Sequence, residues 1–451
     1  MTKKIVLLCS VFVLFVSAGF AQKSREKPNA EIGAMLKEVS AKRIENDVRK
    51  LVSFGTRNTL SEQDNPARGI GAARDWIFAE FQRISNDCGN CLTIEKQTFL
   101  QPKAVRIAEP TNLTNVVATL KGTTDPARIY VVSGHYDSMC SSPTDAVCDA
   151  PGANDDASGS AAVLELARVM SKRKYDATII FMTVAGEEQG LLGATYLAEQ
   201  AKREQMNIEA MFTNDIIGGV MSFKNAANRQ TVRVFSEGVP SNETEAEANT
   251  RRGTGGENDA ASRQLARFIK ESADLYSPKF SVQMVYRRDR YLRGGDHIPF
   301  VERGFPAVRF TEPNEDYNHQ HQNVRTENGT FYGDTVEFVD FGYVANVARI
   351  NAASLARMAL APARPKNVGM VTARLGNDTE LKWDAAAESD LAGYEIVWRD
   401  TVSPVWTNSQ AVGNVNNFVM KGMSKDNFFF GVRAVDKNGN KSPVSFPKPV
   451  R

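Results

Sequence analysis

The sequence contains little histidine, little cysteine and almost no net charge. Only four His and five Cys occur in 451 residues, and 55 Lys and Arg balance 53 Asp and Glu, leaving a formal net charge of +2. This balance gives no support to binding of the nucleic-acid backbone, so we expect no nucleic-acid partner. With 42% hydrophobic and 24% charged residues, global disorder, collagen-like and coiled-coil chains are excluded. The length predicts two or three domains.

Long hydrophobic runs are also scarce, and the one present lies at the N-terminus. A short basic start precedes the apolar segment 5–16, and small residues follow at Gly19 and Ala21. This order predicts a signal peptide over residues 1–21. The run is shorter than the roughly 20 apolar residues that span a membrane. We therefore expect a secreted or periplasmic protein without membrane contact after cleavage.

The four cysteines that follow this segment form two close pairs, Cys88 with Cys91 and Cys140 with Cys148. In an oxidising compartment, two local disulfides are the natural interpretation. The alternative is a redox or zinc-binding CxxC at Cys88 and Cys91. No second CxxC is present to complete a zinc site, which favours the disulfides.

Hydrophobic periodicity predicts an α/β domain over residues 22–362, with its core starting at about residue 31. Strands are expected at 114–120, 129–132, 178–184, 210–217 and 305–310, and helices at 31–50, 70–84, 158–170, 191–201, 265–276 and 335–360. The alternation favours a mostly parallel central sheet flanked by helices. The polar, Gly-rich segment 236–260 is interpreted as a surface loop.

The composition changes at the Pro-containing segment 361–365. Short alternating strands with turn signals follow, which predicts a C-terminal all-β sandwich over residues 363–451. Trp383, Tyr394 and the run 432–436 occupy positions that resemble the core of a fibronectin type III domain. The resemblance implies contact with a surface or polymer, by analogy of fold alone.

The side chains that can carry chemistry follow the ends of predicted strands. They are His135 and Asp137 after strand 129–132, Asp155 before helix 158–170, Glu187 and Glu188 after strand 178–184, Asp215 within strand 210–217, and His319 and His321 after strand 305–310. Ligands of open α/β sheets gather at the carboxyl ends of the strands. Two imidazoles and three carboxylates exceed the needs of one zinc ion, and they suit two metals that share a carboxylate and a water.

These motifs make the α/β domain resemble the M28 family of co-catalytic zinc peptidases, which includes secreted bacterial leucine-type aminopeptidases. The motifs are Gly134–Asp137, Gly152–Gly159, Gly186–Gly190, Asn214–Asp215 and a late His. The resemblance implies two Zn²⁺ per chain and the zinc-exopeptidase fold. It also implies a strained peptide between Asp155 and Asp156, in the cis form.

The resemblance assigns a role to each of these residues. It places His135 and Asp215 on one zinc, Glu188 and the late His on the other, and Asp155 on both. Glu187 would be the general base and Asp137 would orient His135.

The late histidine is the one departure from the family pattern. We favour His321 over His319 as the ligand. Asp296 and His297 match a family stretch near the site, where they would contact substrate or support the ligands.

The implied function is that of an exopeptidase, most simply an aminopeptidase that acts on peptides with a free N-terminus. The basic run 286–291 is either a solvated loop or a contact for a substrate carboxylate. Such a contact would suit an acidic substrate residue or a carboxypeptidase. A glutaminyl cyclase-like enzyme with one metal and an inactive binding or adhesion protein are further alternatives. The complete set of five ligands argues against the first of these, and the Glu187–Glu188 pair argues against the second.

Overall fold

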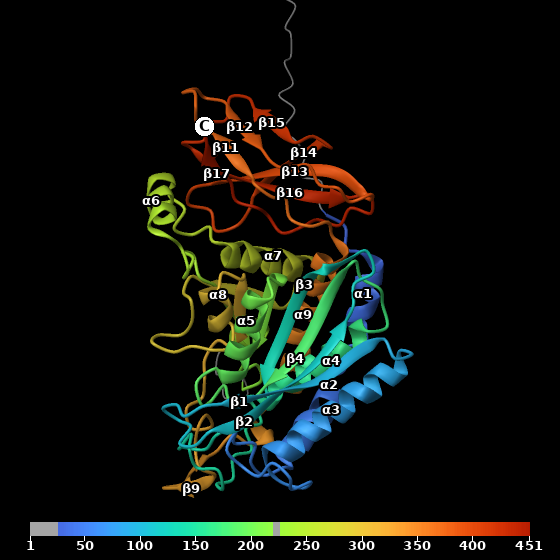
Figure 1. The fold of residues 1–451 in the computed structure, drawn as a ribbon, viewed down its shortest axis with the longest axis vertical. Helices are drawn as coiled ribbons and strands as arrows, with labels where there is room; N and C mark the ends of the chain where they lie inside the picture. The colour runs from blue at the N-terminus through green and yellow to red at the C-terminus, as the bar shows by residue number, and fades with distance from the viewer. Residues whose placement is uncertain (1–25, 220–225) are drawn as a thin grey trace, which may run out of the picture.

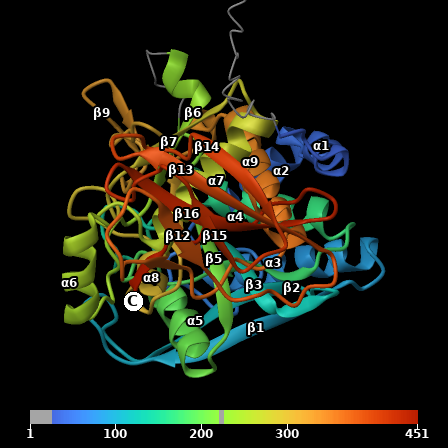
Figure 2. The ribbon, with the colours of Figure 1, turned by 90° about the horizontal axis from the view of Figure 1, so that it is seen from above.

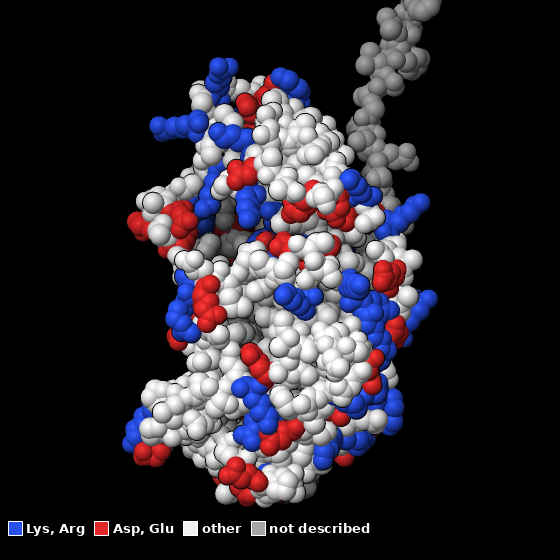
Figure 3. Space-filling model, turned by 45° about the vertical axis from the view of Figure 1, so that its right-hand side comes forward, with Lys and Arg blue, Asp and Glu red and all other residues white. Residues whose placement is uncertain are grey.

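The computed structural model describes residues 26–219 and 226–451. Within these residues, no helix is long and apolar enough to cross a membrane. The predicted signal peptide lies outside the described residues. Figure 3 shows basic and acidic side chains interspersed over the face that it displays, so neither sign of charge dominates that face.

An eight-stranded mixed sheet forms the centre of the larger part of the molecule (Figure 1), with strand order β1-β2-β4-β3-β5-β8-β6-β7. The strands are β1 Leu92–Gln101, β2 Thr111–Leu120, β3 Asp125–His135, β4 Ala177–Val184, β5 Asn207–Asn214, β6 Thr231–Phe235, β7 Ser281–Val285 and β8 Ala307–Thr311. The central strands β4, β3, β5 and β8 are parallel. Antiparallel pairs join β1, β2 and β4 on one side and β8 and β6 on the other. The predicted α/β fold with a parallel sheet centre is confirmed.

Helices cover both faces of this sheet. The helices of the described residues are α1 Ala30–Lys37, α2 Ala41–Val52, α3 Gly69–Asp87, α4 Ala157–Met170, α5 Leu192–Arg203, α6 Glu245–Thr254, α7 Ala261–Tyr276, α8 Ile298–Glu302 and α9 Phe341–Leu360. Of these, α6 lies apart from the sheet, beside the C-terminal strands (Figure 1). Ile179 and Phe181 of β4 pack in the core with α3, α4 and α9. Ile180 and Met182 pack on the other face with α5 and α8. Because successive strand residues face opposite sides, β4 is buried along its whole length.

The connections around β3 create a switch point in the sheet. The chain leaves β3 through α4 on one face and enters β4, then crosses back through α5 on the other face to β5. The neighbours β4 and β5 therefore lie on opposite sides of β3. The connections that follow neighbouring strands turn to opposite faces of the sheet at such a point. They leave a crevice beyond the carboxyl ends of the strands, where ligands bind.

Several element predictions are wrong in detail. The single helix expected at 31–50 is two helices, because Ser40 caps the start of α2 by accepting a hydrogen bond from the Arg43 amide. The expected loop 236–260 contains α6, which begins with a capping box between Thr244 and Glu247. The edge strand β1 and the strands β6 and β7 were not predicted.

The C-terminal part is all β. Two sheets, with orders β15-β12-β11-β17 and β14-β13-β16, enclose a core that includes Trp383 and Tyr394. Their strands are β11 Gly369–Val371, β12 Thr379–Lys382, β13 Leu391–Asp400, β14 Asn408–Gly413, β15 Asn417–Met420, β16 Phe428–Asp436 and β17 Lys448–Val450. The expected all-β C-terminal region is confirmed, and its likeness to fibronectin type III domains stays a prediction.

The C-terminal strands lie over α7, as the two ribbon views agree (Figures 1 and 2). Asp259, which precedes α7, is buried and accepts hydrogen bonds from Arg399 at 2.8 and 2.9 Å. Arg267 of α7 donates to the same carboxylate at 2.8 Å and to the Pro404 carbonyl. This buried charge cluster joins the two parts of the chain.

The first described residues are held in place by contacts with α7 and α9. Glu26 pairs with Arg357 of α9 at 2.6 Å, and the Asn29 amide donates to the Tyr276 hydroxyl at 2.8 Å. The carbonyl of Met358, next to Arg357, accepts a hydrogen bond from Arg128 near the start of β3. Residues 26–29 therefore lie near the amino ends of the parallel strands, opposite their carboxyl ends.

Both predicted disulfides are confirmed: Cys88 bonds to Cys91 and Cys140 bonds to Cys148. The peptide bond between Asp155 and Asp156 is cis, as expected.

Candidate metal centre

Two groups of three side chains converge beyond the carboxyl ends of β3, β4 and β5. Within each group, one candidate ligand atom per residue lies within 4.8 Å of the others: the first group is His135, Glu187 and Asp215, and the second is Asp155, Glu188 and His321. His135 ends β3, and the register pairs it with Val184 at the end of β4. The five ligands expected from the sequence, with His321 as the late His, thus lie in one place.

Asp155 joins the two groups. Its Oδ1 atom lies 3.1 Å from His135 Nε2, and its Oδ2 atom lies 2.8 Å from His321 Nε2. Asp215 Oδ1 lies 3.8 Å from His135 Nε2, and Glu188 Oε1 lies 3.2 Å from His321 Nε2. One carboxylate can therefore serve a cation in each group.

The donor set fits zinc. His135 Nε2, Glu188 Oε1 and His321 Nε2 are buried and have no hydrogen-bond partner among the described residues, although carboxylate or imidazole atoms lie close by. Buried polar atoms are normally paired. When several side chains bind one cation, their nitrogen and oxygen atoms are expected to lie close together without forming hydrogen bonds to one another. Imidazole nitrogen and carboxylate oxygen are ligands that zinc accepts.

The electrostatics of the second group favour a positive charge. Burial alone would lower the pKa of His321, but the Glu188 and Asp155 carboxylates outweigh it and raise that pKa to about 11. Burial would raise the pKa of Asp155, but the charges of His321 and His135 lower it well below its ordinary value. The site thus stabilises a cation between its carboxylates.

Glu187 differs from its neighbour Glu188. Glu187 is half-buried at the wall of a pocket, whereas Glu188 is only 3% exposed. Burial raises the pKa of Glu187 well above its ordinary value, and the Asp215 and Glu188 carboxylates add to this effect against the opposing charge of His135. A carboxylate with a raised pKa binds a proton more readily near neutral pH.

Asp137 connects the ends of β3 and β4. Its carboxylate accepts hydrogen bonds from the amides of Glu187 at 3.3 Å and Glu188 at 3.1 Å, and from the Thr59 hydroxyl at 3.1 Å. His135 Nδ1 lies 3.1 Å from the Asp137 carbonyl oxygen and 3.6 Å from its carboxylate. The expected contact with His135 therefore includes the backbone, while the carboxylate fixes the Glu187–Glu188 turn.

The backbone around Asp155 is held from both sides. Asp156 caps α4 by accepting from the Gly159 amide at 2.9 Å, and it accepts from the His135 amide at 3.0 Å. The start of α4 packs closely against β5, since a Cβ atom on Gly159 would lie 2.2 Å from the Asn214 carbonyl oxygen. Glycine is required there by this approach.

Two charged residues at the site were not predicted. Arg309 is fully buried in β8 and pairs with Asp215 at 3.0 Å. Asp334 accepts from the Asp155 amide at 2.7 Å and from the Asn154 amide. Arg309 could have been singled out from the sequence, because it is a single charged residue within the apolar run 307–310. Asp334 gave no signal, because its partners lie about 180 residues away in sequence.

The remaining predicted residues lie outside both groups. His319 stacks on Phe338 with ring centroids 3.6 Å apart, and its Nδ1 lies 3.1 Å from the Gly333 carbonyl oxygen. His297 is buried, with Nε2 2.8 Å from the Arg288 carbonyl oxygen. Asp296 is also buried, and burial raises its pKa to about 7. The geometry thus brings His321, and not His319, to the candidate ligands.

Known proteins resemble this chain along most of its length. The profile of peptidase family M28 matches residues 115–331, which contain all the residues of the two groups. A Leptosphaeria maculans protein named a probable zinc metalloprotease is 49% identical over 94% of this chain and 98% of its own length. The chain belongs to peptidase family M28.

Other relatives of this M28 chain agree. A Pyricularia oryzae protein named a probable zinc metalloprotease is 48% identical over 94% of this chain and 86% of its own length. Among solved structures, Legionella pneumophila LapA has a TM-score of 0.52 at 20% identity, covering 74% of this chain and 77% of LapA. This likeness shows a shared fold.

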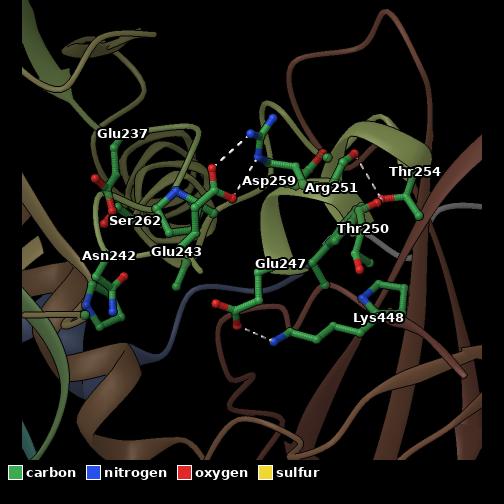
Figure 4. Close-up of a pocket in the computed structure, with 18 of the residues that line it drawn as sticks. Glu237, Asn242, Glu243, Glu247, Thr250, Arg251, Thr254, Asp259, Ser262 and Lys448 are labelled. Atoms are coloured by element: carbon green, nitrogen blue, oxygen red, sulfur yellow. Dashed lines mark hydrogen bonds and ion pairs between the residues drawn. The ribbon is translucent and has the colours of Figure 1, made fainter. Parts of the chain in front are cut away.

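A pocket of about 510 Å³ lies over the two groups of the M28 chain. Its walls include Asp155, Glu187, Glu188, Asp215 and His321. A second cavity of about 330 Å³ lies between α6 and β17 and shares no described lining residue with the first. Figure 4 shows that charged groups there are already paired, such as Glu247 of α6 with Lys448 of β17. The first pocket is therefore the candidate active site.

Proposed function

We propose that this M28 chain is a secreted di-zinc exopeptidase, an aminopeptidase that releases N-terminal residues from peptides. The observation that carries the proposal is the pair of ligand groups joined by Asp155 beneath a pocket of about 510 Å³. A pocket of this size is suited to the end of a peptide chain. The names of the relatives, zinc metalloproteases, support zinc as the metal.

Five side chains would hold the metals. His135 and Asp215 would bind one zinc, Glu188 and His321 the other, and Asp155 both. Bound zinc supplies Lewis-acid chemistry, polarising a carbonyl and lowering the pKa of water. Arg309 and Asp137 keep Asp215 and the Glu187–Glu188 turn in place.

Glu187 is the residue suited to move a proton. Its carboxylate lines the pocket and is more exposed than that of Glu188. A carboxylate in this position can accept a proton from water and pass it to the leaving amine. The hydrogen bond from its backbone amide to Asp137 restrains the turn that carries this side chain.

The two adjacent glutamates test these roles. Glu187→Gln should keep both zinc ions and lose about 10²–10⁴-fold in kcat, because it keeps the shape and loses the basic oxygen. Glu188→Gln should lose zinc, with activity partly restored by excess Zn²⁺. Metal content by mass spectrometry beside kcat distinguishes them. Loss of zinc from Glu187→Gln with an unchanged rate per bound metal would reverse the assignment.

A separate experiment tests from which end of a peptide residues are released. Zinc-loaded protein should release Leu from Leu-Ala-Ala and not from its N-acetylated form, and a chelator should stop the release. Release of the C-terminal Ala from both forms would show a carboxypeptidase instead. Cyclisation of an N-terminal Gln, without hydrolysis of any peptide, would show a glutaminyl cyclase.

Secretion is proposed from the predicted signal peptide and is supported by the two disulfides. Cysteine pairs of this kind persist in oxidising compartments. N-terminal sequencing of the exported protein should find a start at Gln22. Retention of the full chain inside the cell would contradict this part of the proposal.

A further inference from the structure

The catalytic pocket is lined by basic side chains as well as by carboxylates. Arg106 from the β1–β2 loop and Arg290 and Arg293 from the β7–α8 loop line the same pocket as Glu187 and His321. Two zinc ions would balance the charges of Asp155, Glu187, Glu188 and Asp215. The arginines then leave the pocket with an excess of positive charge.

The carboxylate of Glu315 does not cancel this excess. Its Oε2 atom pairs with Arg290 at 3.0 Å and with Arg293 at 2.7 Å, while its Oε1 atom pairs with Arg233 at 3.3 Å. One negative charge is thus shared by three guanidinium groups. Arg106 has no carboxylate partner among the residues that the structure describes.

The arginines differ in how many donors remain available. Arg290 donates to Asp289, Glu315 and the Gly294 carbonyl, so it is largely satisfied. Arg293, whose side chain is 34% exposed, donates only through Nη1 to Glu315 within the described chain. Arg106 likewise donates there only through Nη1, to the Glu188 carbonyl at 2.6 Å. Arg106 and Arg293 therefore keep unpaired N–H groups at the pocket.

Solvation alone accounts for many exposed arginines, but these two are anchored. Arg106 is fastened to the backbone of Glu188, a proposed zinc ligand. Arg293 is fastened to Glu315, whose side chain is only 3% exposed. A guanidinium held in this way loses less entropy when it binds a carboxylate through its remaining donors.

We infer that Arg106 and Arg293 bind a carboxylate of the substrate, so that the enzyme selects peptides that carry a negative charge near the scissile bond. This inference rests on the proposed peptidase function. The carboxylate comes either from an acidic N-terminal side chain or from the C-terminus of a short peptide. Both sources offer the two oxygens that arginine recognises.

Two matched substrate pairs distinguish the sources. Glu-Ala-amide and Gln-Ala-amide differ only in the side-chain carboxylate, and Leu-Ala and Leu-Ala-amide differ only in the C-terminal one. Zinc-loaded protein should show a kcat/KM about 10–100-fold higher for the charged member of one pair, because a site built for a charged hydrogen bond rejects the neutral analogue. The pair that shows the preference identifies the source.

Variants assign the preference to these residues. In the R106Q/R293Q double variant, the ratio of kcat/KM within that pair should fall to about threefold or less. Arg287→Gln is the matched control: Arg287 belongs to the same loop but does not line the pocket. It should keep both the rate and the ratio. No preference in the parent protein, or an undiminished ratio in the double variant, would overturn the inference.

A binding measurement keeps this inference separate from the proposed function. Calorimetry with glutarate and the zinc-loaded protein should give a Kd about 10–100-fold weaker for the double variant than for the parent. If no peptide is hydrolysed, the proposed function fails while the glutarate result still decides the inference. Equal glutarate affinity in both proteins would refute carboxylate binding by Arg106 and Arg293.

Discussion

Replacement of Asp137 by Asn tests how the metal centre is assembled. The two carboxylate oxygens accept from the Glu187 amide, the Glu188 amide and the Thr59 hydroxyl. Asparagine has the same shape, but its NH₂ group must face one of these donors. The least costly orientation places that group at the Glu187 amide, where the hydrogen bond is longest at 3.3 Å.

The magnitude follows from the groups left unpaired. A buried amide without an acceptor costs about 1–3 kcal/mol, and loss of the negative charge weakens the other two hydrogen bonds by about 1 kcal/mol together. We therefore expect the free energy of unfolding to fall by about 2–4 kcal/mol. Zinc affinity should fall about 10–100-fold, as is typical when a group that supports metal ligands is changed.

Two measurements check Asp137→Asn. Urea unfolding with a chelator present reports the stability of the metal-free protein, and competition with a chromophoric chelator reports zinc affinity. Thr59→Val is the control, because it removes one donor and leaves the carboxylate: it should cost about 0.5–1.5 kcal/mol and hardly change zinc affinity. Parent-like stability and zinc affinity in Asp137→Asn would refute the reasoning.

Three further predictions concern stability. Asp259→Asn should lower the free energy of unfolding by about 3–5 kcal/mol, measured in urea, because it leaves the Arg399 guanidinium buried without its charge partner; a loss below 1 kcal/mol would show that the cluster does not join the two parts. Under oxidising conditions, Cys140→Ser should lower the free energy of unfolding by up to about 2.5 kcal/mol relative to the parent. When both proteins are reduced, they should be equally stable; the same difference under both conditions would contradict a stabilising role of the disulfide. Burial raises the pKa of Asp47 to about 7, so its ionisation destabilises the fold as pH rises from about 4 to 7. Asp47→Asn should therefore be about 1–2 kcal/mol more stable than the parent at pH 8, since the side chain is partly exposed, and no more stable at pH 3.5; a gain that is independent of pH would contradict the titration.

The fold could be predicted where burial dictates the pattern. Strand β4 is buried on both faces, and its continuous apolar run identified it. Strand β1 was missed because its exposure alternates weakly, and pairing with β2 stabilises it instead. Helix α6 buries only Ala248. Its capping box was the only local signal, and the polar composition suggested a loop.

The candidate site was predictable for a related reason. Strand ends place His135, Glu187 and Asp215 at one edge of the sheet, so sequence order and sheet topology together bring them close. The supporting partners could not be found in this way, because Arg309 and Asp334 act through contacts distant in sequence. The choice of His321 over His319 depended on the path of one loop, which has no periodic pattern.

The contacts that hold residues 26–29 have a consequence for the aminopeptidase activity proposed above. A peptidase that acts on free N-termini carries a potential substrate at its own start. The ion pair of Glu26 with Arg357 and the hydrogen bond from Asn29 to Tyr276 hold this segment near the amino ends of the parallel strands. The catalytic pocket lies beyond their carboxyl ends. Under the proposed function, self-digestion within one molecule beyond residue 25 would therefore require release of this segment.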